Sequence, residues 1–484
     1  MKAKNYISYL PLILLIMSAG TYSQDLDDCV DSLQCESSWI GLSEDDRESV
    51  FEFAEEYKDF IKLARTELSF VDEATAFAEA NGFEPLTSAT SLRVGTRVYE
   101  VNRDRTISLM VIGEKSLTEG FHVIGAHIDS PRLELKGRPL YGDSEFALFQ
   151  TNYHGGIKYH QWTNIPLALM GRVDKKDGTT ISISIGLDRD DPIFMIPELS
   201  PHVDRGRNSE TLGNFLRPED MDPIIAHVPG EGGEEVVDQV LAYLTDEYGI
   251  SRADLVSAEL SLVPATAPRD MGLDRGLIAA YGQDDRLASY AAMRAIAEVD
   301  RPQKTTMAFL VDNEEVGNRN NTGARSDHFS DLLSRLLYAE LGDDYREPVF
   351  RGALRQTKFI SIDVNPGINP IDTSVWESGN APKLGYGVNL KLYGQGNTAN
   401  SEFIAWTRQL LDGNDIPWQT ATYKVGVGGG GTIGGEFSIS KLLILVGPCF
   451  RFTLLTPSAQ RLMSTACIAL PVPSMHMLSS KICL

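Results

Sequence analysis

Apolar and polar positions follow helical spacing near the start of the chain and later give way to short apolar runs. Over residues 44–65, apolar side chains recur three and four positions apart, which predicts an amphipathic helix with a core-facing side and no catalytic role. Ser43 and Asp46 form a capping-box pattern at its start. A second helix is expected over 71–80, because Asn81-Gly82 is a common stop signal.

Short apolar runs predict strands farther along. The run 307–311 stops abruptly at Asp312-Asn313-Glu314-Glu315 and a glycine, which suits a buried strand of a parallel sheet, although periodicity alone leaves a helix open. A helix is expected just before it, over 286–297. Alternating strands and helices predict an α/β domain. We expect its strands at 97–101, 106–112, 121–126, 307–311 and 359–364.

The pattern of predicted elements changes between residue 137 and about residue 270. Short β-like pieces such as 181–185 alternate there with proline-rich turns, and one helix is expected near 234–247. The strand and helix alternation then resumes, which predicts an inserted β-rich domain at 137–270. The catalytic domain would comprise 40–136 and 271–484. A chain of 484 residues is long enough for two or three domains.

Residues 1–24 have the order of a secretory signal. Lys2 and Lys4 precede the apolar stretch 7–17, and Ser18-Ala19-Gly20 follows it. The stretch is short for a membrane span, and no other segment is long and apolar enough, so we expect export without stable membrane association. Cys29 and Cys35 could form a small disulfide loop, but the total of five cysteines argues against a disulfide framework. The net charge of −23 argues against nucleic acid as a partner.

Polar pairs stand at the ends of several predicted elements. His127 and Asp129 form an H-x-D pair after a strand, where alternate side chains point the same way and Asp129 can orient the imidazole. Asp284-Asp285 opens a helix, and Asp363 ends the strand 359–364. Each alone has an ordinary explanation: a locally held histidine, an N-cap, or a turn aspartate.

Together with Glu314-Glu315, these residues predict a two-metal hydrolase. Two adjacent glutamates near buried surface are costly unless a cation neutralises them. A two-metal centre needs a shared carboxylate, terminal nitrogen and oxygen ligands, and a free carboxylate that handles the attacking water. Imidazole and carboxylate ligands without thiolates suit zinc, manganese or cobalt.

Several motifs in one order resemble the M18 metalloaminopeptidases, the aspartyl aminopeptidase and aminopeptidase I group, with the bacterial members most similar. The resemblance covers about 44–434. It implies a phosphorylase-like or hydrolase-like α/β catalytic domain, interrupted by a smaller β-rich domain that builds oligomer contacts. It also implies tetrahedral dodecamers with two metals per active site. The motifs are GAHIDSPRLELK, GQDDRLASY, DNEEVGN, SIDVNPG, LGYG and VGGGGTIG.

The same resemblance implies a role for each site residue. His127 and Glu315 would bind one metal, Asp363 the other, and Asp284 would bridge them. Glu314 would be the general base, and Asp129 would support His127. The family's last ligand lies in an S-M-H tripeptide, here His476, although 435–484 is atypical for the family and only eight residues follow that histidine.

Other features receive lesser expectations. His154, His160 and His202 could reach a neighbouring subunit's site, but a surface position is favoured for them. The glycine run 428–431 lacks the Gly-Lys-Ser/Thr of a phosphate loop, so close passage of backbone past metal or substrate is the better interpretation.

The expected function is therefore a dinuclear metalloaminopeptidase that removes the first residue of peptides. Two divalent metals, zinc foremost and manganese or cobalt as options, would activate water with Glu314 as base. A non-catalytic shell-forming homologue and a related carboxypeptidase or deacylase remain alternatives. The amino-terminal segment indicates a secreted or periplasmic protein, whereas the resemblance indicates the cytoplasm. The preferred first residue of the substrate is left open.

Overall fold

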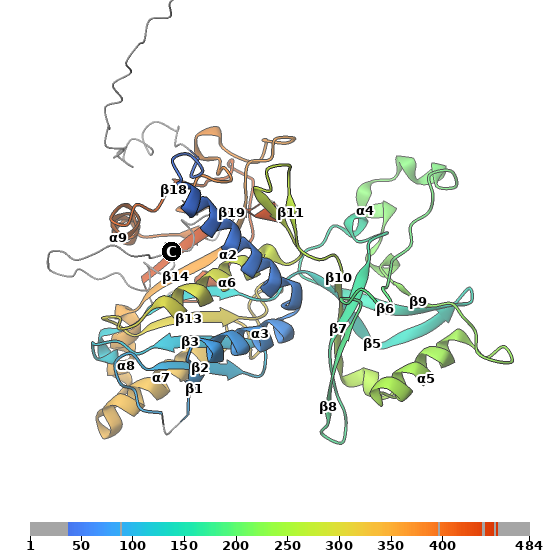
Figure 1. Ribbon diagram of the computed structural model, residues 1–484, viewed down its shortest axis with the longest axis horizontal. Helices are drawn as coiled ribbons and strands as arrows, with labels where there is room; N and C mark the ends of the chain where they lie inside the picture. The colour runs from blue at the N-terminus through green and yellow to red at the C-terminus, as the bar shows by residue number, and fades with distance from the viewer. Residues whose placement is uncertain (1–36, 88–89, 395–396, 438–440, 450–451, 454–484) are drawn as a thin grey trace, which may run out of the picture. The chain divides into compact units, whose positions relative to one another are not determined.

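A mixed sheet carries the candidate site in the computed structural model, which describes residues 37–87, 90–394, 397–437, 441–449 and 452–453 (Figure 1). The sheet has twelve strands, ten of them in the order β1-β2-β3-β13-β4-β14-β19-β20-β12-β11, while β15 pairs with β18 and β19. In that order the ten strands are Glu84–Pro85, Arg97–Asn102, Thr106–Val111, Thr306–Val311, His122–His127, Lys358–Pro366, Lys441–Cys449, Phe452–Thr453, Leu277–Ala279 and Arg269–Met271, with β15 at Val388–Leu390 and β18 at Trp418–Thr420.

Helices cover both faces of this sheet because its central strands are buried on both sides. Along β13, Ala308 and Leu310 belong to one apolar cluster, and Met307, Phe309 and Val311 belong to another. The first cluster includes side chains of α2 (Glu44–Leu63), α3 (Glu67–Ala80), α6 (Gln283–Glu298) and α9 (Ser401–Asp412). The second includes those of α7 (His328–Leu341) and α8 (Glu347–Gln356).

A second, antiparallel sheet has its own core. Its six strands follow the order β8-β7-β10-β5-β6-β9, and α5 (Val236–Tyr248) contributes to the apolar cluster on it. Short elements α4 (Leu212–Phe215), β16 (Tyr393–Gly394) and β17 (Asn397–Thr398) complete the set. The strands of the second sheet are Thr180–Ile185, Leu167–Asp174, Ala258–Pro264, Arg132–Asp143, Phe146–His154 and Ile224–Ala226.

The expected fold class, an α/β unit with a mixed sheet and an additional β-rich part, is confirmed. The run 307–311 is a strand, parallel to β4 and antiparallel to β3, so the helical alternative is wrong. The second sheet begins at Arg132, five residues before the predicted insertion. The division into domains with boundaries at 137 and 270 stays a prediction.

The helix boundaries follow local capping chemistry. Ser43 accepts a hydrogen bond from the backbone N–H of Asp46, as the capping pattern predicts. Helix α3 begins four residues earlier than expected, because Thr66 and Ser69 form a reciprocal capping box there. The predicted signal segment 1–24, Cys29, Cys35 and His476 lie outside the described residues. No helix in the described part of the chain is long and apolar enough to cross a membrane.

Candidate metal centre

The candidate site lies where parallel strands of the large sheet end together. In the pairing of β13 with β4, Val311 stands opposite His127, so the DNEE turn begins beside the imidazole. Strand β14 is also parallel to β4 and carries Asp363 near its end. Helix α6 packs over β4 and β14, and its first turn supplies Asp284 and Asp285 in non-helical backbone conformations. The carboxyl edge of the sheet thereby gathers the predicted residues.

The His127 imidazole is surrounded by carboxylate oxygens. Its Nε2 lies 3.3 Å from Asp284 Oδ1, 3.7 Å from Asp363 Oδ1 and 3.9 Å from Glu314 Oε2. Its Nδ1 lies 3.2 Å from the carbonyl oxygen and 3.3 Å from Oδ1 of Asp129. Both of these atoms are acceptors, so Nδ1 carries a proton. Burial lowers the pKa of His127, but the carboxylates of Asp129, Asp284 and Asp363 outweigh it and raise that pKa well above its usual value. A metal bound among these carboxylates would take the place of the proton on Nε2.

Two adjacent aspartates compete for the bridging position. One compact group comprises His127, Asp285 and Asp363, whose potential ligand atoms all lie within 4.8 Å of one another. The Asp285 carboxylate is fully buried, accepts the backbone N–H of His127 at 3.4 Å, and has its pKa raised well above the usual value, first by burial and then by Asp363. The Asp284 side chain is 52% exposed, and its Oδ1 lies 3.3 Å from His127 Nε2, so either aspartate can offer an oxygen to a metal beside His127.

The two glutamates of the DNEE turn are electrostatically strained. Burial, followed by the charges of Asp363, Asp129 and Asp284, raises the pKa of Glu314 to about 7 even though His127 opposes the shift. Burial and the nearby Asp284 raise the pKa of Glu315 to about 8. Buried carboxylates that repel one another are stabilised by a shared cation.

The donor set fits a divalent metal. Across the described ranges, no lysine or arginine forms an ion pair with Asp284, Glu314, Glu315 or Asp363. One imidazole nitrogen and several carboxylate oxygens around it are ligands of the kind that zinc accepts. The sequence-predicted residues His127, Asp129, Asp284, Glu314 and Asp363 are all brought together, and Glu315 follows in the same turn.

Asp129 connects the two halves of the centre. Its Oδ1 accepts the backbone N–H of Glu314 at 3.0 Å, and its Oδ2 accepts that of Glu315 at 3.1 Å. The same carboxylate lies beside His127 Nδ1. Burial would raise the pKa of Asp129, but the hydrogen bonds with His127 and His154 outweigh it and hold the pKa far below the usual range. Asp129 therefore remains a carboxylate that orients other groups.

The surface position expected for His154 is wrong. The side chain is 5% exposed, and its Nε2 lies 2.9 Å from Asp129 Oδ2. A histidine at the end of a strand in the second sheet was read as a surface residue because its partner lies 25 residues earlier in the chain. His160 and His202 are exposed, as expected.

Two residues beside the centre were missed. The pKa of Lys391 is lowered by burial, against the opposing effect of the carboxylates of Asp363 and Glu314, which places an amine near the site. Tyr423 donates a hydrogen bond to Asn365 Oδ1 at 3.0 Å and stacks on Trp376 with ring centroids 4.1 Å apart. Neither has a local sequence signal, since both come from later segments that fold back over the sheet.

The glycine run 428–431 is exposed, and a side chain at Gly429 would meet the Tyr423 ring at 2.8 Å. At Gly430 and Gly431 an added Cβ would meet nothing within 4 Å. Gly429 therefore packs closely against an aromatic ring, while passage of this run past metal or substrate stays a prediction.

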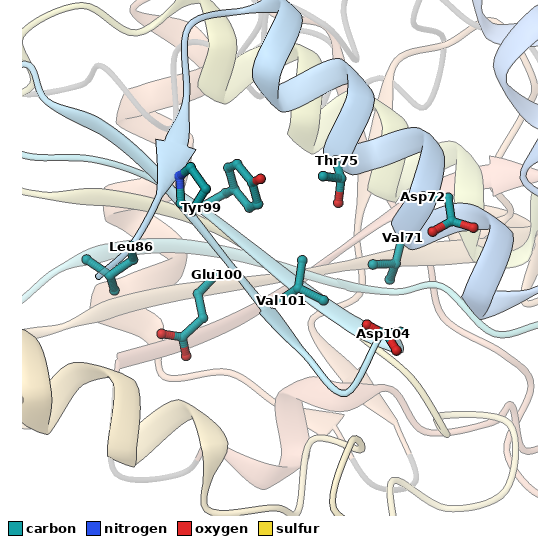
Figure 2. Close-up of a pocket in the computed structure, with 9 residues that line it drawn as sticks. Val71, Asp72, Thr75, Leu86, Tyr99, Glu100, Val101 and Asp104 are labelled. Atoms are coloured by element: carbon teal, nitrogen blue, oxygen red, sulfur yellow. The ribbon is translucent and has the colours of Figure 1, made fainter. Parts of the chain in front are cut away.

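A separate cavity of about 530 Å³ lies between α3 and β2 (Figure 2). Figure 2 shows Asp72 and Thr75 on the helix side, and Glu100 and Asp104 on the strand side. None of the predicted site residues lines it. Asp104 is paired with Arg172 at 2.8 Å and Glu100 with Arg335 at 2.5 Å, so this hollow is acidic but largely balanced by basic side chains.

Known proteins share both the sequence and the fold. Residues 60–442 match the family described as aminopeptidase I zinc metalloprotease (M18). A probable M18 family aminopeptidase 1 of Thermotoga maritima is 40% identical over 401 residues, covering 81% of this chain and 88% of the relative. The crystal structure of a T. maritima M18 aminopeptidase superposes with a TM-score of 0.85 at 35% identity, covering 90% of this chain and all of that one.

A more distant similarity shows the fold alone. The S. cerevisiae mApe1 structure, described as a dodecamer, is 20% identical and covers 86% of this chain and 95% of its own, with a TM-score of 0.69. The profile match covers most of the chain, and the bacterial relative exceeds 30% identity over four fifths of it. This chain therefore belongs to the M18 family of aminopeptidase I zinc metalloproteases.

Proposed function

We propose that this protein is an aminopeptidase whose active site holds two divalent metal ions, zinc foremost. The observation that carries the proposal is the set of carboxylates around His127 that form no ion pair with a lysine or arginine of the described residues. Family membership agrees with this chemistry.

Each residue has a distinct part in the proposal. Asp284 would bridge the two metals, His127 and Glu315 would complete one site, and Asp363 would belong to the other. His476, outside the described residues, is the proposed last ligand of that second site. Bound divalent ions would polarise the peptide carbonyl and make water more acidic.

Glu314 is the proposed general base. Burial and the neighbouring carboxylates raise its pKa to about 7 without a cation, and bound metal ions would lower it. Glu314 would then be a carboxylate at neutral pH, able to accept a proton from water and pass it to the departing amine. Its backbone N–H is fixed by Asp129, so the carboxylate has a defined position beside His127. Peptides with a free amino terminus are the proposed substrates.

Two further properties extend the proposal. We propose a homo-oligomer, and a dodecamer in particular, by analogy with the yeast protein of the same fold. We also propose that residues 1–24 direct export and are removed, since their basic, apolar and small-residue order is typical of a signal. Amino-terminal sequencing of the natural protein decides the second point, and an intact Met1 on a cytosolic protein would refute it.

The deciding experiment compares peptides that differ only at their ends. Purified protein is assayed with a free-amine peptide, the same peptide N-acetylated, and the same peptide amidated at its carboxyl end. We expect release of the first residue from the free-amine and amidated peptides alone. A chelator should abolish the release, and added Zn²⁺, Mn²⁺ or Co²⁺ should restore it. Cleavage of the acetylated peptide would favour a carboxypeptidase or deacylase, and no cleavage with metal present would favour a non-catalytic homologue.

A further inference from the structure

The Asp129 carboxylate has four donors, and three of them belong to the proposed metal centre. Oδ1 receives the Glu314 N–H at 3.0 Å and faces His127 Nδ1 at 3.3 Å. Oδ2 receives the Glu315 N–H at 3.1 Å. The fourth donor is His154 Nε2, 2.9 Å from Oδ2. A carboxylate offers about four lone-pair sites, so His154 completes the set.

His154 reaches this carboxylate from the second sheet. It ends strand β6, and its other ring nitrogen, Nδ1, lies 2.9 Å from Glu134 Oε1 on the neighbouring strand β5. Both partners are carboxylates, so both ring nitrogens donate and the ring is an imidazolium. Glu134 is in turn held by Arg132 at 3.1 Å, and Arg132 pairs with the buried Glu67 of α3.

The residue after His154 also touches the proposed centre. Gly155 has a φ of +70°, and a Cβ added there would lie 3.0 Å from both Cβ and Oε2 of Glu315. A side chain at this position would displace the proposed metal ligand. The end of β6 therefore contacts the site at two adjacent residues, one through a hydrogen bond and one through close packing.

We propose that His154 is a positioning residue for the proposed reaction. It fixes the rotation of the Asp129 carboxylate, which aligns the imidazole of His127 and the turn that carries the general base. This inference rests on the proposed function of the same site. The second sheet would then contribute a positioning residue to the metal centre, although no residue of that sheet was predicted to bind metal.

A purely structural role would give a different result from positioning. If His154 only joined the two sheets, its loss would lower thermal stability and leave metal affinity and kcat unchanged in the folded fraction. If it positions Asp129, its loss leaves Oδ2 with one donor and lets the carboxylate turn. Partners that orient metal ligands typically contribute about 10- to 100-fold in metal affinity or activity.

Two conservative variants separate the contacts of the two ring nitrogens. In His154→Gln the amide nitrogen reaches the position of Nε2 and can still donate to Asp129. In His154→Asn the amide reaches only the position of Nδ1, on the side of Glu134. The full-length protein carrying each variant is compared with His154→Ala and with His160→Ala, a control that alters an exposed histidine six residues away.

The measurements are kcat and KM on the free-amine peptide, the Zn²⁺ dissociation constant of the metal-free protein, and the thermal midpoint. We expect His154→Ala and His154→Asn to lose about 10- to 100-fold in kcat and in Zn²⁺ affinity, with KM changed much less. His154→Gln should recover most of both losses, and His160→Ala should match the parent.

Wild-type kcat and Zn²⁺ affinity in His154→Asn, or equal losses in the Gln and Asn variants, would overturn the proposal. The Zn²⁺ titration keeps it testable if the proposed function fails. A parent chain that binds Zn²⁺ but hydrolyses no peptide would refute the aminopeptidase proposal alone, because the affinities of the variants would still decide the part of His154.

Discussion

The metal centre and the cavity beside α3 are both rich in carboxylates, but their charges are balanced in different ways. In the cavity, Asp104 pairs with Arg172 and Glu100 pairs with Arg335. Figure 2 shows these two acidic side chains. At the metal centre, the described residues supply one histidine and no lysine or arginine ion pair for four carboxylates. Of the two acidic clusters, the metal centre is therefore the one that a bound cation would stabilise.

The positions of the two clusters explain the contrast. The cavity lies at the edge of the large sheet, beside β1 and β2, where long basic side chains can reach from exposed surface. The metal centre lies at the carboxyl ends of the central strands β4, β13 and β14, enclosed by α6. The exposed ion pairs of the cavity stabilise the fold only slightly. Uncompensated buried charge at the metal centre is costly, so a cation bound there would stabilise the protein more than those ion pairs do.

Among variants that compare the metal centre with the cavity, Glu314→Gln is expected to lose the most activity. The variant should keep its metals and lose about 10²- to 10⁴-fold in kcat, because the amide cannot accept a proton from water. Glu100→Gln makes the same chemical change in the cavity and should leave kcat unchanged. Steady-state kinetics with metal analysis by plasma emission checks both, and wild-type kcat in Glu314→Gln at normal metal content contradicts the base assignment.

A somewhat smaller effect is expected for Asp284→Asn. Removing one charge from the proposed bridge should lower metal content below two per chain and reduce activity by about 100-fold. Asp285→Asn is the matched variant, and it should retain its metals, because in the proposal Asp285 binds no metal and its carboxylate accepts the backbone N–H of His127. The opposite ranking of metal content in the two variants would make Asp285 the bridging ligand.

His476→Ala tests whether the atypical end of the chain completes the centre. If His476 binds the second metal, metal content should fall from about two per chain toward one, since carboxylates without imidazole hold such ions poorly. Activity should fall with it, by about tenfold or more. A parent with one metal and a variant identical to it would remove His476 from the site and favour a non-catalytic homologue.

The smallest effect is expected in the cavity. Burial, and then the charge of Asp104, raise the pKa of Asp72, so the folded state holds this proton more tightly than the unfolded state. The stability from Asp72 is therefore present at low pH and is lost as pH rises through the raised pKa. At neutral pH, Asp72→Asn should raise the thermal midpoint by no more than about 2 °C without changing activity. A clear loss of activity would show that the cavity takes part in function.

The sequence alone determined the elements and most of the chemistry of the site. Local periodicity fixed α2, and the abrupt change from apolar to acidic residues at Val311 located the end of β13. These features depend on neighbours within a few residues, which a sequence displays directly. The H-x-D, DD, EE and SID motifs were sufficient to name the residues around His127, because parallel strands end at a common edge.

Only the tertiary structure decided how His154 joins the centre. Next to the turn between β5 and β6, Asp143 pairs with Phe146. An antiparallel pairing that continued in this register would place His154 opposite Leu135. The structure pairs it with Arg132, because the register shifts between Leu135 and Leu140. Nothing in the sequence indicates this shift in register. It moves the His154 imidazole three residues toward the amino-terminal end of β5, which is the end nearest Asp129. The adjacent Asp284 and Asp285 likewise differ in a way that the sequence cannot reveal, since the Asp284 side chain is 52% exposed and the Asp285 side chain is buried.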